Sequence, residues 1–222
     1  DDKGIHCCCK FFIGQKAVAQ HLRVHPATPQ SRLLKIAAQA MHKGGLVIYP
    51  SDTTYAIACH MGDKAALEKI IALRNLDKNH QFSLACRDLS DLSTYAKVEN
   101  ADYRLLKRNT PGPFTFLLQA SREVPKRLMH PKKKLIGLRV PDHPIAQGLL
   151  EVFGEPMVTA TLRLEDTDDN LVDIDEIVDT LGNHRDIEVI LDGGSCGAET
   201  STVVDMSDGD PVVTRQGLGI LS

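Results

Sequence analysis

The chain has 222 residues with 42% hydrophobic and 25% charged content, and its formal net charge is −3. This length and composition are typical of a globular protein with a sizeable core. They argue against a membrane protein, because no apolar run approaches a length of about 18 residues. Cys59, Cys86 and Cys196 are dispersed through apolar or glycine-rich segments and do not form a disulfide framework. We therefore expect a reducing compartment and a cytoplasmic location.

The beginning of the chain shows no clean hydrophobic period. We interpret residues 1–19 as a loosely attached extension or an added, non-native segment, and residues 20–222 as a single domain. No repeat or low-complexity linker divides that domain. Cys7, Cys8 and Cys9 follow His6, but consecutive side chains diverge and no second ligand pair stands at a usable spacing, so we do not expect a zinc site.

Helical and strand patterns alternate along the rest of the chain. Apolar spacing, with Asp63, Asp88 and Asn100 as helix caps, predicts helices over residues 30–42, 63–74, from 88, 100–108, 144–153 and 173–181. Short apolar runs predict strands over residues 46–49, 82–86, 114–119, 136–140, 157–162, 189–191, 202–205 and 212–215. The last two are separated by Ser207-Asp208-Gly209-Asp210, a hairpin signal. The pattern predicts an α/β fold with a mixed sheet and helices packed on it.

Polar side chains follow the first of these strands. Pro50 ends the apolar run, and residues 51–55 then supply three hydroxyls, one carboxylate and a tyrosine. Loops at the carboxyl ends of strands in an open α/β sheet are common ligand sites, so these residues are candidates for one. The alternative is an ordinary polar turn in which Asp and Thr side chains satisfy local backbone donors.

Charge is distributed unevenly. Between Arg104 and Arg139 there are ten Lys or Arg residues against one acid, whereas residues 165–192 hold eleven acids against one arginine. A basic concentration that includes Lys132, Lys133 and Lys134 can bind nucleic-acid phosphates. The alternative is a solvated loop without a partner.

Six polar segments follow or end predicted strands: residues 51–55, 110–115, 138–144, 159–163, 200–205 and 215–217. They offer arginines, hydroxyls and glycine amides, which recognise phosphate and carboxylate. In their order along the chain and in their residues, these segments resemble the YrdC/YciO family of threonylcarbamoyl-AMP synthases, most closely its YciO branch. The resemblance extends from about His25 to Gly217. Residues 50–56 are similar to the family's Pro-Thr-Glu-Thr-x-Tyr-Gly, and residues 139–144 match its Arg-x-Pro-x-His-Pro.

The resemblance implies a YrdC-like twisted open mixed sheet flanked by helices, with a large basic concave cavity. It implies that L-threonine, bicarbonate and ATP, with Mg²⁺ bridging the phosphates, form threonylcarbamoyl-AMP and pyrophosphate for tRNA modification. The implied catalytic residues are Arg74, Arg139 and Thr161, the substrate-binding residues Thr53, Tyr55 and His143, and the nucleotide-binding residues Ser201 and Arg215.

Two departures from the family pattern affect the expected activity. Synthases have Lys-x-Arg where this chain has Arg74-Asn75-Leu76, and Ser-x-Asn where it has Thr161-Leu162-Arg163. Leu76 cannot bind an anion, and Arg163 only donates hydrogen bonds where an amide also accepts them. We therefore expect a weak synthase. The alternative is a non-catalytic protein that binds double-stranded RNA or tRNA with the same basic cavity.

Overall fold

The structure is a computed structural model that describes residues 18–77, 80, 82–163 and 170–222. Most of the predicted extension over residues 1–19, including Cys7 to Cys9, therefore lies outside the described residues. Ala19 is buried, and its N–H donates to the Gly182 carbonyl at 2.9 Å.

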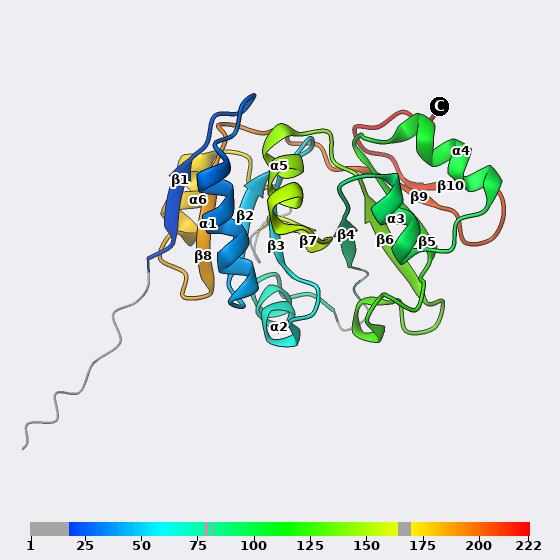
Figure 1. Ribbon diagram of the computed structural model, residues 1–222, viewed down its shortest axis with the longest axis horizontal. Coiled ribbons are helices and arrows are strands. Elements are labelled where there is room, and N and C mark those ends of the chain that lie inside the picture. Colours follow the sequence, from blue (N-terminus) through cyan, green and yellow to red (C-terminus); the bar gives the residue numbers. More distant parts are fainter. Residues whose placement is uncertain (1–17, 78–79, 81, 164–169) are drawn as a thin grey trace, which may run out of the picture.

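The described part of the chain contains ten strands, six α-helices and one 3-10 helix over Lys126–Leu128 (Figure 1). The strands are β1 (Gln20–Arg23), β2 (Leu46–Pro50), β3 (Tyr55–His60), β4 (Ser83–Ala85), β5 (Phe114–Gln119), β6 (Leu135–Arg139), β7 (Met157–Thr161), β8 (Ile187–Asp192), β9 (Thr202–Asp205) and β10 (Val212–Arg215). The helices are α1 (Ser31–His42), α2 (Lys64–Leu73), α3 (Leu89–Tyr95), α4 (Asn100–Asn109), α5 (Pro144–Phe153) and α6 (Ile174–Leu181).

The predicted α/β fold with a mixed sheet is confirmed. One sheet has the order β1-β8-β2-β3-β7-β4-β6-β5-β9-β10. β8 lies parallel to β1 and β2, β4 parallel to β6, and β5 parallel to β9, while the other neighbours are antiparallel. All six predicted helices and all eight predicted strands are present, but β1 and β3 were not predicted.

Helix caps explain where several helices begin. Asp63 accepts the Ala66 N–H at 3.0 Å, and Asp88 accepts the N–H groups of Ser90 and Asp91, as predicted. The prediction that Asn100 caps α4 was wrong by one residue. Glu99 is the cap, and its N–H donates to the Asp102 carboxylate at 3.2 Å, which leaves Asn100 inside the first turn.

Two clusters of buried residues hold the helices against the sheet. Leu46 and Ile48 of β2 belong to one cluster and Val47 and Tyr49 to the other, because successive side chains of a strand point to opposite faces. α1 and α5, which lie side by side in Figure 1, supply residues to the cluster that contains Val47. The other four helices contribute to the cluster that contains Leu46.

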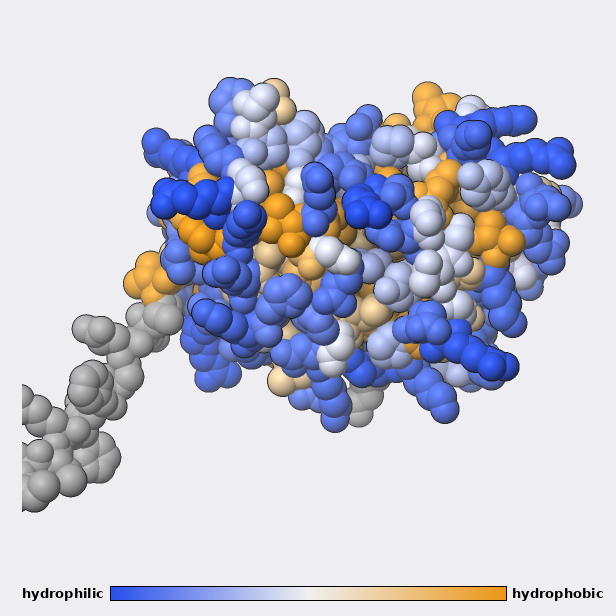
Figure 2. Space-filling view, in the orientation of Figure 1, coloured by the Kyte–Doolittle hydropathy of each residue, from blue (hydrophilic) through white to orange (hydrophobic). Residues whose placement is uncertain are grey.

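Hydrophilic side chains cover most of the face drawn in Figure 2, with smaller apolar patches between them. Among the described residues, no helix combines the length and the apolar character that crossing a membrane requires.

Candidate active site

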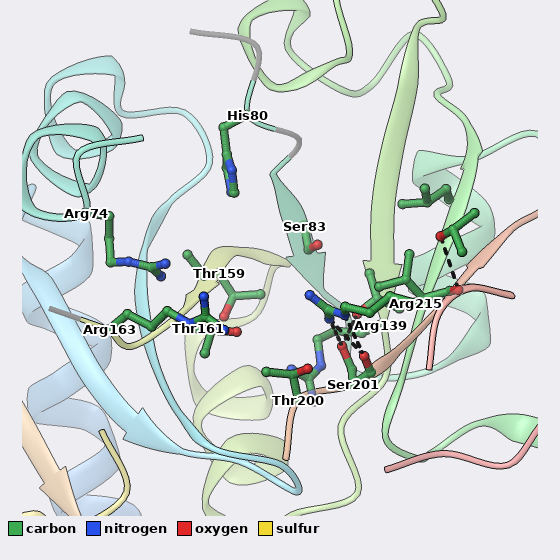
Figure 3. A pocket seen from close by; sticks show the side chains of 15 residues that line it. Arg74, His80, Ser83, Arg139, Thr159, Thr161, Arg163, Thr200, Ser201 and Arg215 are labelled. Carbon is green, nitrogen blue, oxygen red and sulfur yellow. Dashed lines mark hydrogen bonds between the residues drawn. The ribbon is translucent and has the colours of Figure 1, made fainter. Parts of the chain in front are cut away.

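A cavity of about 430 Å³ lies along six neighbouring strands, from β7 to β10 (Figure 3). Its described lining contains four arginines, seven hydroxyl side chains and no carboxylate. The arginines are Arg74, Arg139, Arg163 and Arg215. Such a lining attracts anions, because guanidinium groups and hydroxyls donate hydrogen bonds to phosphate and carboxylate oxygens.

Strand alternation builds this lining from otherwise apolar segments. Thr115, Arg139 and Thr159 face the cavity from β5, β6 and β7. Their neighbours Phe116, Leu138 and Val158 are fully buried in the core. Each strand therefore fixes its polar side chain by burying the next one.

Arg139 forms a buried ion pair with Asp52. Only 9% of the Arg139 side chain and 7% of the Asp52 side chain are exposed, and Nη2 of the arginine donates to Oδ1 of the carboxylate. The second carboxylate oxygen accepts the Asp142 N–H at 3.0 Å. Asp52 thus ties the turn between β2 and β3 to the segment after β6. Nε of Arg139 is buried without a hydrogen-bond partner among the described residues.

Ser201 and Arg215 form one end of the cavity. Nη2 of Arg215 donates to the Ser201 carbonyl at 2.8 Å, and the Ser201 and Thr115 hydroxyls lie 2.8 Å apart. Burial lowers the pKa of Arg215, and the charges of Arg163 and Arg139 lower it further. A Cβ at Gly217 would lie 2.2 Å from the Thr200 carbonyl oxygen. Glycine at this position lets the chain after β10 return against the segment before β9.

Arg74 and Arg163 form the other end. Both extend toward the cavity from the side that also carries Thr161 (Figure 3). Burial lowers the pKa of Arg74 to about 10, and the nearby Arg163 charge contributes. Leu76 is partly buried against the core cluster, so it takes no part in the described lining.

Of the eight residues assigned from the sequence to catalysis, substrate binding or nucleotide binding, five line the cavity: Arg74, Arg139, Thr161, Ser201 and Arg215. Thr53, Tyr55 and His143 do not belong to its described lining. Thr53 is buried, with its hydroxyl 3.1 Å from that of Ser51, and the Tyr55 hydroxyl donates to the Gly194 carbonyl at 2.7 Å. His143 precedes α5, and burial lowers its pKa. Lys132, Lys133 and Lys134 are exposed in a turn elsewhere.

The residue assignments made from the sequence left out several contributors to the site. They did not include Arg163, which lines the cavity, or Asp52, which pairs with Arg139, although both residues lie in the candidate segments. Thr115 and Thr159 were also omitted. Their signal was available, since a polar residue between apolar neighbours of a buried strand marks a position that faces something other than the core.

One group of possible metal ligands lies among the described residues, outside the cavity lining. Ligand atoms of His42, His60 and Glu155 all lie within 4.8 Å of one another. The Gly62 N–H donates to Nδ1 of His60 at 2.8 Å, which places the proton of the neutral ring on Nε2, 2.9 Å from Glu155. A hydrogen bond to Glu155 therefore already uses the nitrogen that a metal would need.

Mg²⁺ in nucleotide sites is usually held by one or two carboxylates together with phosphates. The described cavity lining contains no carboxylate that could bind the expected Mg²⁺. The lining therefore does not fit a protein-held Mg²⁺.

The comparisons with known proteins agree with the motifs. The Sua5/YciO/YrdC family model, described as telomere recombination, matches residues 39–217. The uncharacterized protein YciO of Escherichia coli K12 is 46% identical over 202 residues, covering 91% of this chain and 97% of the relative. The crystal structure of E. coli YciO superposes with a TM-score of 0.87 over the same shares of the two chains.

Synthases of the family are more distant. Mouse threonylcarbamoyl-AMP synthase is 29% identical over 195 residues, which cover 83% of this chain and 68% of the relative. P. abyssi Sua5 complexed with L-threonine superposes with a TM-score of 0.79 at 25% identity, covering 90% of this chain and 57% of Sua5. The six motifs, the sheet and the family model agree, and the chain belongs to the Sua5/YciO/YrdC family.

Proposed function

We propose that this protein is a threonylcarbamoyl-AMP synthase of low activity. The observation that carries the proposal is a cavity with four arginines and no carboxylate in its described lining. Such a lining leaves its positive charge to be balanced by an anionic ligand. The names of the distant relatives, and the threonine bound to Sua5, support the choice of reaction.

The reaction suits a site that supplies donors and no nucleophile. The threonine amine adds to the bicarbonate carbon and water leaves, which gives a carbamate. A carbamate oxygen then attacks the α-phosphorus of ATP, the bond to the β-phosphate breaks, and pyrophosphate departs. The protein has to hold two anions together and stabilise the charge that develops between them, which arginines and hydroxyls do by position alone.

In this proposal the two ends of the cavity bind different reactants. Arg139, Ser201 and Arg215 bind the nucleotide phosphates, and Arg74 and Thr161 bind the threonine-derived carbamate. Mg²⁺ enters as the counter-ion of the ATP phosphates, and we assign no step to it.

Thr53, Tyr55 and His143 were assigned to substrate binding from the sequence. Because Thr53 and Tyr55 are buried and their hydroxyls are engaged by Ser51 and Gly194, we propose that these two residues position the turn that carries Asp52. His143 keeps its substrate-binding role as a proposal.

Pyrophosphate release with ATP, Mg²⁺, bicarbonate and threonine tests the reaction, with reactions lacking threonine or bicarbonate as controls. The proposal expects release that needs both co-substrates, together with threonylcarbamoyl-AMP detected by mass spectrometry. Release that does not depend on threonine, or no product at any enzyme concentration, contradicts it.

The second candidate is a non-catalytic RNA-binding protein. A second cavity of about 520 Å³ has a basic rim formed by Lys97, Arg122, Lys126 and Lys134. Lys132 and Lys133 beside it are exposed, and their backbone N–H groups donate to Nδ1 of His130. This basic surface favours binding of duplex RNA or tRNA through phosphates.

A further inference from the structure

The second cavity lies at the ends of β5 and β6 that are remote from the first cavity. Thr115, near the start of β5, and Arg139, at the end of β6, line the first cavity. Ala120, directly after β5, and Lys134, directly before β6, line the second. Its volume of about 520 Å³ falls within the range of small-molecule sites. The proposed reaction uses none of its lining residues.

Hydrogen bonds hold the segments that form its walls. After β5, the Ser121 N–H donates to the Tyr95 carbonyl at 2.9 Å. Before β6, the His130 N–H donates to the Leu135 carbonyl at 2.8 Å, and the Lys134 N–H donates to the His130 carbonyl at 2.9 Å. The cavity is therefore bounded by backbone that internal hydrogen bonds fix.

The lining combines apolar side chains with cations. Ala120, Val124, Met129 and Pro131 are its apolar members, and Met129 packs against the core cluster that contains Leu46. The cations are Lys97, Arg122, Lys126 and Lys134. None of these four forms an ion pair with a carboxylate of the residues that the structure describes.

His130 adds a hydrogen-bond donor of fixed orientation. The N–H groups of Lys132 and Lys133 donate to its Nδ1 at 3.3 and 3.1 Å. Because Nδ1 accepts these bonds, the proton of the neutral ring is on Nε2. The ring belongs to the cavity lining, so Nε2 supplies a donor for an anion there.

Two kinds of contact are needed to use this lining fully. Duplex RNA offers phosphates to the cations, but its stacked bases leave the apolar part of the cavity in water. An uncharged apolar molecule leaves the cations without a partner. A molecule that carries an anionic group on an apolar body supplies both contacts.

We propose that the second cavity binds a small amphipathic anion. Its phosphate or carboxylate head contacts the cations and His130, and its apolar body packs on Met129 and Pro131. This site is separate from the proposed synthase reaction, and its ligand differs from the duplex RNA of the second candidate function.

Calorimetric titration of the full chain tests the proposal with two pairs of probes, octyl and butyl phosphate, and octanoate and butyrate. Each buried methylene contributes about four-fold in affinity, so the longer probe of at least one pair should bind at least about 10-fold more tightly than the shorter. The pair that binds more tightly identifies the head. Octanol and inorganic phosphate, which carry one half each, should bind at least about 10-fold more weakly than that longer probe. Affinities that do not depend on chain length in either pair overturn the proposal.

Variants place the binding in the second cavity. Arg122→Gln combined with Lys126→Gln, at two exposed positions of the lining, should weaken binding of the longer probe at least about 10-fold. Lys132→Gln combined with Lys133→Gln removes the same charge from exposed residues outside the described lining and is the matched control, which should change little. Arg215→Gln, in the first cavity, should also change little.

Two results from these variants contradict the proposal. An equal loss in the matched control shows that the probe responds to the basic surface as a whole, as an RNA phosphate would. A loss with Arg215→Gln that the double variant of the lining does not show places the probe in the first cavity. Neither result bears on the proposed synthesis, which pyrophosphate release tests separately.

Discussion

The buried ion pair between Asp52 and Arg139 gives the most direct test of how the site is held together. Asp52→Asn keeps the shape of the side chain and an acceptor for the Asp142 N–H, but it removes the negative charge. The Arg139 guanidinium then stays buried, with 9% of its side chain exposed and no counter-ion in the described cavity lining. We expect the free energy of unfolding to fall by about 3 to 5 kcal/mol, the usual cost of breaking a buried pair from one side.

Urea unfolding measures this loss, and an exposed ion pair provides the control. The side chains of Lys64 and Glu68 are 75% and 62% exposed, so Glu68→Gln should cost less than about 1 kcal/mol. Adding Arg139→Gln to Asp52→Asn should restore much of the lost stability, because a neutral pair leaves no buried charge. If Asp52→Asn unfolds within about 1 kcal/mol of the native protein, the pair does not hold the site as we argue.

ATP should reduce the difference in the free energy of unfolding between the native protein and Asp52→Asn. Its phosphates supply the negative charge that Asp52→Asn removes, and a ligand at 100 times its dissociation constant stabilises a folded protein by about 2.7 kcal/mol. The variant should therefore gain more stability from the same ATP concentration than the native protein does. An equal or smaller gain would show that the phosphates do not approach Arg139.

Two further predictions concern protons and RNA. Burial lowers the pKa of His143 below the ordinary 6.5. On acidification the unfolded chain is therefore protonated at a higher pH than the folded protein. The free energy of unfolding should fall as the pH drops from about 6.5 toward the lower pKa of the folded state. His143→Gln should flatten this fall in urea titrations between about pH 7 and 5, and an equally steep fall would contradict the assignment. Replacing Lys132, Lys133 and Lys134 together by alanine should weaken duplex-RNA binding and reduce its salt dependence; an unchanged salt slope would exclude that surface.

Most helices and strands could be predicted from local pattern because their signals are local. Asp63 and Asp88 cap helices through their own neighbours, and the buried strands are short apolar runs. β1 gave no such signal, since three of its four residues are exposed and it is defined by parallel pairing with β8. β3 was not predicted because the polar residues before it were interpreted as a loop that carries a site. In the structure these residues form the turn of a tight hairpin, in which Pro50 pairs with Tyr55.

The same hairpin limits what the site motifs could predict. Residues 51–55 were grouped as candidates because they are adjacent in the sequence. In the structure the Asp52 carboxylate pairs with Arg139, whereas Thr53 is buried. The Tyr55 hydroxyl donates a hydrogen bond to the Gly194 carbonyl. Adjacency gives the residues of a motif but not the direction in which each side chain points. The contact between Arg163 and Asn170 likewise depends on the fold, since neither residue belongs to a motif that implies the other.

The altered motifs lead to the last prediction, which concerns catalytic rate. Each missing or misplaced donor near developing charge costs about 2.7 to 4 kcal/mol of transition-state stabilisation, by analogy with deletions of oxyanion-site donors. We therefore expect threonylcarbamoyl-AMP synthesis that is slower than that of a full-motif synthase but measurable. The variant that restores the pattern combines Arg74→Lys, Leu76→Arg, Thr161→Ser and Arg163→Asn.

The restored variant should release pyrophosphate faster in a threonine-dependent reaction, and this rate should change more than ATP affinity, because the donors act on charge that develops in the transition state. Single changes should do little, since groups that share one anion are not additive. Leu76 packs against the core, so the same variant without Leu76→Arg is the control for folding. If the native protein already matches a full-motif synthase, or the folded variant gains no rate, other residues set the activity.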